Sequence, residues 1–233
     1  RVVFPCHNYK HAPVVKTVDD IIASGEIGKV HGLTLHTYRT THAKGVKEWK
    51  TDWRRDKKYS GGGIAMDHGS HTFYLTFNWL KSLPTAVTAK MVKISENWDT
   101  EDNFSCVLTF PTGYANAHLT WTAGVRKVIY TLQGSSGAIT IDDDDVQVAR
   151  TDASGNSTVR KFAIESHWGD ASHVGWFNSM FDKFAACITA GDYVNDELKE
   201  AYHCIQIIHK AYESSDSGSK ELKLDTTFGF LEV

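Results

Sequence analysis

The sequence predicts an α+β domain in which a large, mainly antiparallel open sheet carries helices on one face. A long series of strand-like runs joined by short turns follows Pro84, and short turns between consecutive strands favour antiparallel pairing. A helical pattern runs from the glycines at 61–63 to Leu80, and two further helical stripes close the chain. The second face of the sheet must then be covered or serve as an interface.

The stretch before the central helix predicts two strands, one helix and a long loop. Residues 1–8 read as a strand. Pro13 suits the first turn of a helix that ends near Gly25. Residues 30–40 alternate between apolar and polar side chains, as a strand does. Residues 41–60 are charged and irregular, which predicts a long loop that lies over a site.

The stretch after Pro84 divides into short strands separated by turns that contain Gly, Ser or Asn. The predicted strands are 85–94, 101–110, 114–122, 126–133, 137–141, 145–150 and 157–163. Apolar residues at helical spacing then predict two closing helices, around 177–188 and around 198–212.

Composition and charge exclude several classes of protein. The chain has 233 residues, with 25 basic and 28 acidic side chains and a formal net charge of −3. That balance favours neither nucleic acid nor an anionic membrane as a partner, and no apolar run reaches the length of a membrane span. The cysteines are scattered without Cys-x-x-Cys spacing, so we expect buried, reduced thiols in a cytoplasmic protein. They are Cys6, Cys106, Cys187 and Cys204.

Asp67 and His71 are the first candidates for chemistry. They lie four residues apart in the predicted helix, so their side chains are neighbours on one face, together with Tyr74 and Asn78. A carboxylate beside an imidazole fixes the tautomer of the ring and raises its basicity, and histidine exchanges protons near neutral pH. The same spacing also fits a structural pair at the start of the helix, where the helix dipole favours an acidic residue.

Metal binding is the main competing chemistry. Candidate ligands form two clusters, Cys6 with His7 and His11, and Asp67 with His68 and His71. Two histidines three or four residues apart on a helix can share a zinc ion. The Glu of an H-E-x-x-H motif is absent, however, and twelve histidines make chance clusters common, so we predict no metal site.

The motifs around the glycine stretch follow a recognisable order. Gly61-Gly62-Gly63 is followed by Asp67, Gly69 and His71, and Trp53-Arg54 stands upstream. Supporting stretches lie at 8–13, 21–30, 134–139, 181–191 and 211–218. Together they resemble the C-terminal domain of the glucose–fructose oxidoreductase / inositol dehydrogenase (Gfo/Idh/MocA) family, and the resemblance covers nearly the whole chain.

This resemblance implies an NAD(P)-dependent oxidoreductase that transfers a hydride between nicotinamide and a carbinol carbon of a sugar, polyol or related hydroxy compound. His71 is implied as the proton-transfer group and Asp67 as its partner beside the substrate hydroxyl. A base of this kind is needed because hydride removal from a carbinol carbon leaves a hydroxyl proton.

The resemblance also implies substrate-binding residues. They are Asn8, Lys10, Arg54, His167 and His173. Lys10 stands where the family usually has Arg, and a lysine lacks the bidentate grip of a guanidinium. The two histidines precede a closing helix in a region that often lines the substrate pocket of the family.

The cofactor-binding half of such an enzyme is absent from the sequence. No predicted strand is followed by Gly-x-Gly-x-x-Gly and a helix, and the Glu-Lys-Pro motif that ends the family's Rossmann domain is missing. The chain also begins without Met in a predicted strand. We therefore expect residues 1–233 to be a single substrate-binding and oligomerisation domain of a longer enzyme, inactive alone, with NAD or NADP held mainly by an N-terminal domain.

Other interpretations stay open at this point. In the family the open sheet face makes dimer or tetramer contacts, so a homo-oligomer is expected here. The alternatives to an enzyme domain of this class are a non-catalytic binding or assembly module of the same fold and, less favoured, a metal-dependent hydrolase that uses Asp67, His68 and His71.

Overall fold

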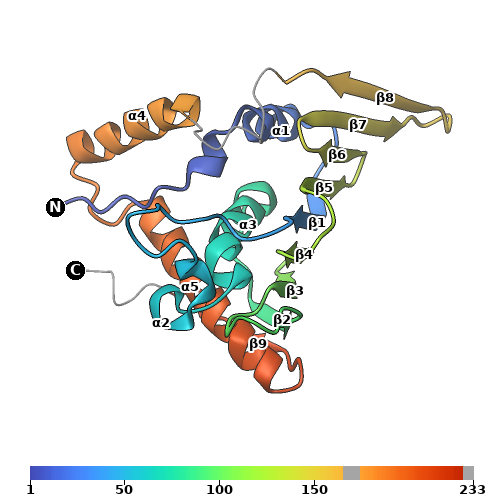
Figure 1. The fold of residues 1–233 in the computed structure, drawn as a ribbon. Helices are drawn as coiled ribbons and strands as arrows, with labels where there is room; N and C mark the ends of the chain where they lie inside the picture. Colours follow the sequence, from blue (N-terminus) through green and yellow to red (C-terminus); the bar gives the residue numbers. More distant parts are fainter. Residues whose placement is uncertain (165–173, 228–233) are drawn as a thin grey trace.

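The computed structural model describes residues 1–164 and 174–227 and shows an open sheet with helices on one of its faces (Figure 1). The strands are β1 (Val30–Tyr38), β2 (Ala86–Val92), β3 (Asn103–Phe110), β4 (Gly113–Thr120), β5 (Lys127–Gly134), β6 (Ala138–Asp142), β7 (Asp145–Thr151), β8 (Ser157–Phe162) and β9 (Leu222–Lys223). The helices are α1 (Pro13–Ala23), α2 (Lys57–Ser60), α3 (Ile64–Leu80), α4 (Val174–Ala190) and α5 (Asp196–Asp216), with short 3-10 turns η1 (Asn8–His11) and η2 (Trp53–Arg55). The predicted α+β class is confirmed.

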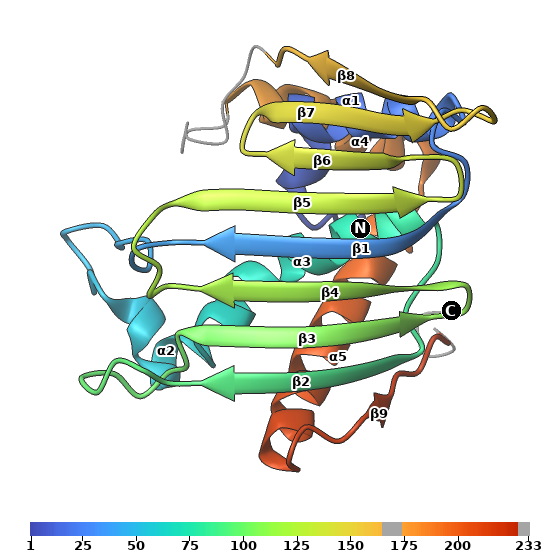
Figure 2. The same ribbon diagram turned by 90° about the vertical axis from the view of Figure 1, so that its right-hand side faces the viewer.

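The strand order explains how distant parts of the chain meet. Within the described residues the nine strands follow the order β8-β7-β6-β5-β1-β4-β3-β2-β9 (Figure 2). Most neighbours are antiparallel, as the short turns predict, but the central pair β1 and β4 is parallel because the chain passes through α3, β2 and β3 between them. Tyr38 at the end of β1 is paired with Thr120 at the end of β4 and with Lys127 at the start of β5. The ends of these three central strands therefore lie together at one end of the sheet, beside α2 in Figure 2. We call this border of strand ends the sheet edge.

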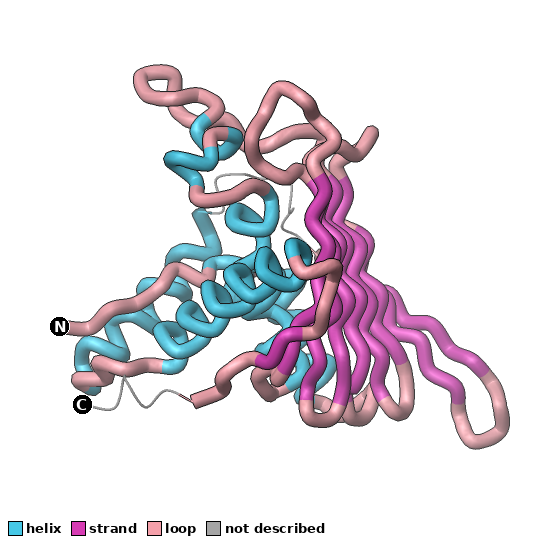
Figure 3. The backbone as a smooth tube through the Cα atoms, turned by 90° about the horizontal axis from the view of Figure 1, so that it is seen from below, coloured by secondary structure: helices cyan, strands magenta, loops and turns pink. Residues whose placement is uncertain are grey.

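Alternation along the strands separates a buried face from an open one. In β3, Phe104 and Leu108 are buried whereas Ser105 and Val107 are exposed. The helices lie on the buried face (Figure 3), where α3 contacts β1, β3, β4 and α5. Burying a large apolar side chain contributes about 1.5–3 kcal/mol, so this layer fixes the position of α3.

Residues 1–8 do not form the strand that their pattern predicts. In the structure they are irregular up to the η1 turn, and Val3 is 57% exposed. A strand needs a neighbouring strand to pair its backbone groups, and in the described part of the chain none lies beside this segment. The side chain of Asn195 donates instead to the Val3 carbonyl at 2.9 Å.

Helix α4 leaves part of its predicted apolar stripe uncovered. Met180 is buried, but Phe181 and Ile188 are 58% and 55% exposed. The apolar surface of this helix therefore continues beyond what the described chain covers. Among the described helices, none has the length and apolarity that crossing a bilayer requires.

The cysteines match the predicted thiol state but not all of the predicted burial. All four are free, and Cys106 and Cys204 are buried as expected. Cys6 is exposed, because it lies in the irregular segment rather than in a strand of the sheet.

The start of α3 is closed by a carboxylate. Glu101 accepts hydrogen bonds from the N–H groups of Gly63 (2.8 Å) and Ala65 (3.0 Å), and the Tyr212 hydroxyl donates to the same carboxylate at 2.9 Å. These bonds satisfy N–H groups that the first turn of a helix leaves unpaired, and the anion suits the positive end of the helix dipole. The glycines allow the close approach that this capping requires.

Gly63→Ala is expected to lower the free energy of unfolding by about 2 kcal/mol, the usual cost of forcing an extra methyl group into a packed site. A Cβ on Gly63 would lie 1.8 Å from the backbone carbonyl oxygen of Glu101, so the backbone itself must shift. Gly124→Ala is the matched control, since nothing lies within 4 Å of its added Cβ. Urea denaturation of both variants checks the expectation, and equal stabilities would contradict it.

Candidate active site

Asp67 lies in the first turns of α3 and is held by an arginine. Its Oδ1 accepts a hydrogen bond from Nε of Arg54 at 2.7 Å, and its Oδ2 lies 3.5 Å from Nε2 of His68. The side chains of Asp67 and Arg54 are 20% and 23% exposed, so both still reach solvent. The expected direct pairing of Asp67 with His71 is therefore replaced by pairing with Arg54. The guanidinium offers a charge-assisted bond, which is stronger than one from a neutral imidazole.

His71, one turn further along α3, is held by two tyrosines. Its Nδ1 lies 2.7 Å from the Tyr74 hydroxyl, and its ring stacks on Tyr9 with 4.3 Å between centroids and 17° between planes. The backbone N–H of Tyr9 donates to the same Tyr74 hydroxyl at 3.2 Å. Tyr74 was expected on a polar face of the helix, but it is buried, because this hydroxyl network and the ring of His7 enclose it.

The Tyr74 contact is compatible with a His71 ring that carries its proton on Nε2. The Tyr74 oxygen accepts from the Tyr9 N–H and keeps its own hydrogen to donate to Nδ1 of the neutral imidazole. The ring proton then sits on Nε2, at the opposite side of the imidazole. Burial raises the pKa of Tyr74 well above its ordinary value, so the phenol stays protonated.

The loop that carries Arg54 is anchored to the sheet edge. Arg55 donates to Nδ1 of His42 at 3.2 Å, and Nε2 of His42 lies 2.7 Å from Asp52. Arg55 also forms an ion pair of 3.5 Å with Asp102, which is fully buried. The predicted long loop 41–60 is thus an ordered segment with two short helical turns, and its network holds Arg54 against α3.

Sequence reasoning missed three residues of this site, Tyr9, Arg39 and Arg126. Arg39 follows β1 and Arg126 precedes β5, so the register that pairs Tyr38 with Lys127 brings the two arginines to the same sheet edge. The guanidinium of Arg39 lies close enough to the Tyr9 phenol to act on its pKa. The available signal was an arginine near the end of predicted strand 30–40 and another at the start of predicted strand 126–133, but the pairing of those strands was needed to use it.

The pKa of His68 depends on the positive charges at this site. Burial, and then the positive charges of Arg39, Arg54 and Arg126, lower the pKa of His68 to about 3, so its ring is neutral at physiological pH. Burial also raises the pKa of the Tyr9 phenol, against the opposing effect of Arg39. The described surroundings of Asp67 are therefore strongly cationic. This environment disfavours a metal cation, and it gives the predicted hydrolase cluster of Asp67, His68 and His71 no support.

The other predicted substrate-binding residues have different surroundings. Asn8 lies in η1, and its side-chain oxygen is buried without a hydrogen-bond partner in the described structure, so it keeps an open acceptor. Lys10 is only 13% exposed and donates to Glu197 at 3.0 Å and to Glu200, so its charge is already compensated. His167 and His173 lie outside the described residues.

His7 and two glutamates form the one group of candidate metal ligands among the described residues. His7 donates to Glu197 at 2.7 Å, and Lys10 and Lys183 bind the other oxygen of that carboxylate at 3.0 and 2.5 Å. We call His7, Lys10, Lys183, Glu197 and Glu200 the Glu197 network. Two lysines already neutralise its carboxylates, so the network is an ion-pair cluster that ties η1 to α4 and α5.

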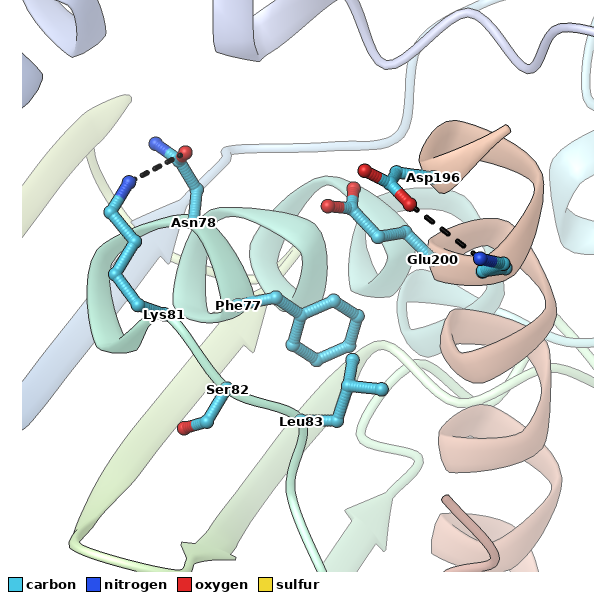
Figure 4. Close-up of a pocket in the computed structure, with 8 residues that line it drawn as sticks. Phe77, Asn78, Lys81, Ser82, Leu83, Asp196 and Glu200 are labelled. Atoms are coloured by element: carbon cyan, nitrogen blue, oxygen red, sulfur yellow. Dashed lines mark hydrogen bonds and ion pairs between the residues drawn. The ribbon is translucent and has the colours of Figure 1, made fainter. Parts of the chain in front are cut away.

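A pocket between the end of α3 and the start of α5 lies away from Asp67 and His71, and Glu200 of the Glu197 network lines part of it (Figure 4). Phe77 and Leu83 form its floor, and Asn78, Lys81, Asp196 and Glu200 stand around it. It is more than two helical turns beyond Asp67 on α3. Its polar groups form ordinary surface contacts, such as that of Lys81 with Asn78 at 3.5 Å.

Comparison with known proteins identifies the family. The family model described as the GFO/IDH/MocA C-terminal domain matches residues 15–140, just over half of the chain. The chain therefore belongs to the GFO/IDH/MocA family, in which it corresponds to the C-terminal domain.

Individual relatives agree with this assignment. The Bacillus subtilis (strain 168) protein named "Putative oxidoreductase YteT" is 32% identical over 82 residues, which cover 35% of this chain and 18% of YteT. Levoglucosan dehydrogenase in complex with NADH and levoglucosan has a TM-score of 0.79 at 19% identity, covering 96% of this chain and 66% of that one. Aldose-aldose oxidoreductase from Caulobacter crescentus, complexed with glycerol, has a TM-score of 0.73 at 18% identity, covering 96% and 64%. The chain thus spans less than two thirds of the length of these relatives, and at such identities the structural likeness shows the fold alone.

Proposed function

We propose that this chain is the substrate-binding domain of an oxidoreductase that moves a hydride between NAD or NADP and a carbinol carbon of a sugar, polyol or related hydroxy compound. The observation that carries the proposal is His71, held between Tyr9 and Tyr74 and next to the Asp67–Arg54 pair, in a chain of this family. Solved structures of the same fold, whose titles name NADH with levoglucosan or with L-sorbose, support this class of substrate.

His71 handles the proton of the substrate hydroxyl in this proposal. Its Nε2 points away from Tyr74 and exchanges a proton with the substrate oxygen, while the Tyr74 hydroxyl holds Nδ1. In the reduction direction the protonated ring gives up the Nε2 proton, and the Tyr74 oxygen accepts from Nδ1–H. In the oxidation direction the ring accepts the hydroxyl proton at Nε2. Asp67 and Arg54 orient the substrate's neighbouring hydroxyl groups. The Asp67 carboxylate accepts hydrogen bonds from them, and the Arg54 guanidinium donates to them.

The glycine loop before α3 does not fit the phosphates of a dinucleotide. A helix start binds phosphate through free N–H groups, but here the carboxylate of Glu101 occupies those of Gly63 and Ala65. A Cβ on Gly62 would lie 1.9 Å from the Tyr212 hydroxyl, so the loop is packed against α5. We therefore propose that a separate domain of the full-length enzyme holds the cofactor. The exposed Val3 in the irregular segment 1–7 and the exposed apolar side of α4 support a contact with such a domain.

The isolated chain of residues 1–233 is expected to show no dehydrogenase activity and no binding of NADH at micromolar affinity. The reason is that the glycine-rich helix start in the described residues is already filled by Glu101. Calorimetric titration of the chain with NADH checks this, with a full-length family enzyme titrated in parallel as the positive control. Micromolar binding by the isolated chain would overturn the two-domain proposal.

We also propose that the open face of the sheet pairs with a second copy of the protein. In the described residues no helix covers this face (Figure 2). It displays Val107 and Tyr114 at 43% and 39% exposure beside polar side chains. A face that mixes apolar and polar side chains suits a partner face of the same composition, which a second copy of the protein supplies.

A further inference from the structure

The sheet edge beside the proposed site places two arginines side by side. Tyr38 of β1 is paired with Lys127 of β5, and the next residues outward are Arg39 and Arg126. Like charges on directly neighbouring strands destabilise a sheet. An anion bound beside Arg39 would reduce this repulsion.

Arg39 is fixed in place without such an anion. Its backbone N–H donates to the Thr120 carbonyl at 2.9 Å, its carbonyl accepts from Ala123 at 3.1 Å, and its Nη1 donates to the Tyr38 carbonyl at 2.8 Å. Among the described residues, no carboxylate forms an ion pair with this partly buried guanidinium. Arg55, at the same edge, shows the usual arrangement, an ion pair with buried Asp102. A partly buried charge without a counter-ion is unfavourable, because its lost hydration is not replaced by an ion pair.

The same edge faces the proposed proton-transfer group. Tyr9 lies close enough to Arg39 for the guanidinium to act on its pKa, and its ring lies flat on His71 with a centroid distance of 4.3 Å. Arg54 joins the cluster through its hydrogen bond to Asp67 at 2.7 Å. The positive charges of Arg39, Arg54 and Arg126 all act on His68, whose neighbour in sequence is Asp67. Three guanidinium groups therefore act on the same turn of α3.

We propose that Arg39, Arg54 and Arg126, which we call the arginine edge, bind an anionic group of the substrate, so that the enzyme acts on a sugar acid or sugar phosphate. Guanidinium groups hold planar carboxylates and phosphate oxygens with paired, charge-assisted hydrogen bonds. Arg39 is the central contact, and the ring of Tyr9 sets the spacing between the anion and the carbinol carbon at His71. This inference rests on the proposed function, since it concerns the substrate of the same site.

Calorimetric titration of the 233-residue chain with D-glucuronate, D-glucose 6-phosphate and D-glucose tests the arginine edge. At least one anionic sugar is expected to bind about tenfold or more tightly than glucose, an advantage that weakens with added salt. The anionic sugar that binds with the higher affinity identifies the recognised group as a carboxylate or a phosphate. Arg39→Gln is expected to remove the preference, and Arg126→Gln, at an exposed position, to weaken it. Arg150→Gln, at an exposed arginine of β7, is the matched control and should keep the preference.

Several outcomes would overturn the proposal. They are equal binding of glucose and the anionic sugars, a preference that survives in both Arg39→Gln and Arg126→Gln, or no binding of either anionic sugar. Circular dichroism of each variant establishes that it is folded. The titration uses neither cofactor nor turnover, so a failed anion preference leaves the role of His71 intact. Conversely, full turnover in a His71 variant would remove the proposed function without affecting the measured preference.

Discussion

Replacing His71 by alanine in the full-length enzyme is expected to lower turnover by about 10² or more, the usual contribution of a positioned acid–base group. The ring is held on both sides, by stacking on Tyr9 at 4.3 Å and by the Tyr74 hydroxyl at 2.7 Å. A fixed imidazole with its Nε2 directed away from these contacts matches the geometry that proton exchange with a substrate hydroxyl requires. The imidazole of His68, three residues earlier on α3, is no substitute as a base, because burial and the nearby arginines lower its pKa to about 3.

The measurement is steady-state turnover followed by nicotinamide absorbance. His31→Ala is the matched control, because His31 is an exposed histidine of β1 at the surface of the sheet. The control should keep full activity. If His71→Ala also keeps it while both variants are folded, His71 has no part in proton transfer, and the non-catalytic module becomes the better interpretation of the fold.

Sequence reasoning located the strands well because their signal is local. Alternating burial in β3 and the turns after Pro84 predict boundaries within a few residues of those observed. The parallel pairing of β1 with β4 was not predictable in this way, since short turns report only on strands that follow each other. The predicted strand at 1–8 was wrong for a related reason, because its pattern is intrinsic whereas a strand also requires a neighbour.

The candidate site was only partly visible in the sequence. The i, i+4 spacing correctly placed Asp67 and His71 on the same helix, but it could not show that Arg54 and Tyr74 offer each of them a better partner. Arg39 lies far from both in sequence and reaches the cluster through the register of the sheet. Resemblance pointed to Lys10 as a substrate contact, whereas its position beside two glutamates of α5 gives it a structural environment.

Glu197→Gln is expected to lower the free energy of unfolding by about 3 kcal/mol, the lower end of the cost of breaking a buried ion pair by removing one partner. The Glu197 side chain is 2% exposed and binds His7, Lys10 and Lys183 at 2.7, 3.0 and 2.5 Å. An amide would leave these cations facing a neutral group. The Glu197 network joins η1, α4 and α5. Losing its ion pairs should therefore weaken the contacts of η1 and α4 with α5.

The pH dependence follows from the two pKa shifts. Burial alone would raise the pKa of Glu197, but the hydrogen bond from His7 and the charges of Lys10 and Lys183 outweigh it and hold the pKa well below the ordinary 4.5. This contribution is present above that ordinary value and is lost as the pH falls through the lower pKa of the folded state. Burial alone would lower the pKa of His7, but its bonds to Glu197 and Glu200 raise it above 6.5. That contribution is complete below 6.5 and is lost as the pH rises through the folded-state pKa.

Urea denaturation of the wild type and of Glu197→Gln between acidic and mildly alkaline pH measures both effects. The wild type should lose stability at both ends of this range, and the variant should show a flatter profile, because neither the carboxylate nor its bond to His7 remains. Glu213→Gln on the same helix is the matched control, since Glu213 is 53% exposed and, among the described residues, forms an ion pair only with exposed Lys210. Its change should stay within about 0.5 kcal/mol. Equal losses in the two variants would mean that the Glu197 network does not hold η1, α4 and α5 together.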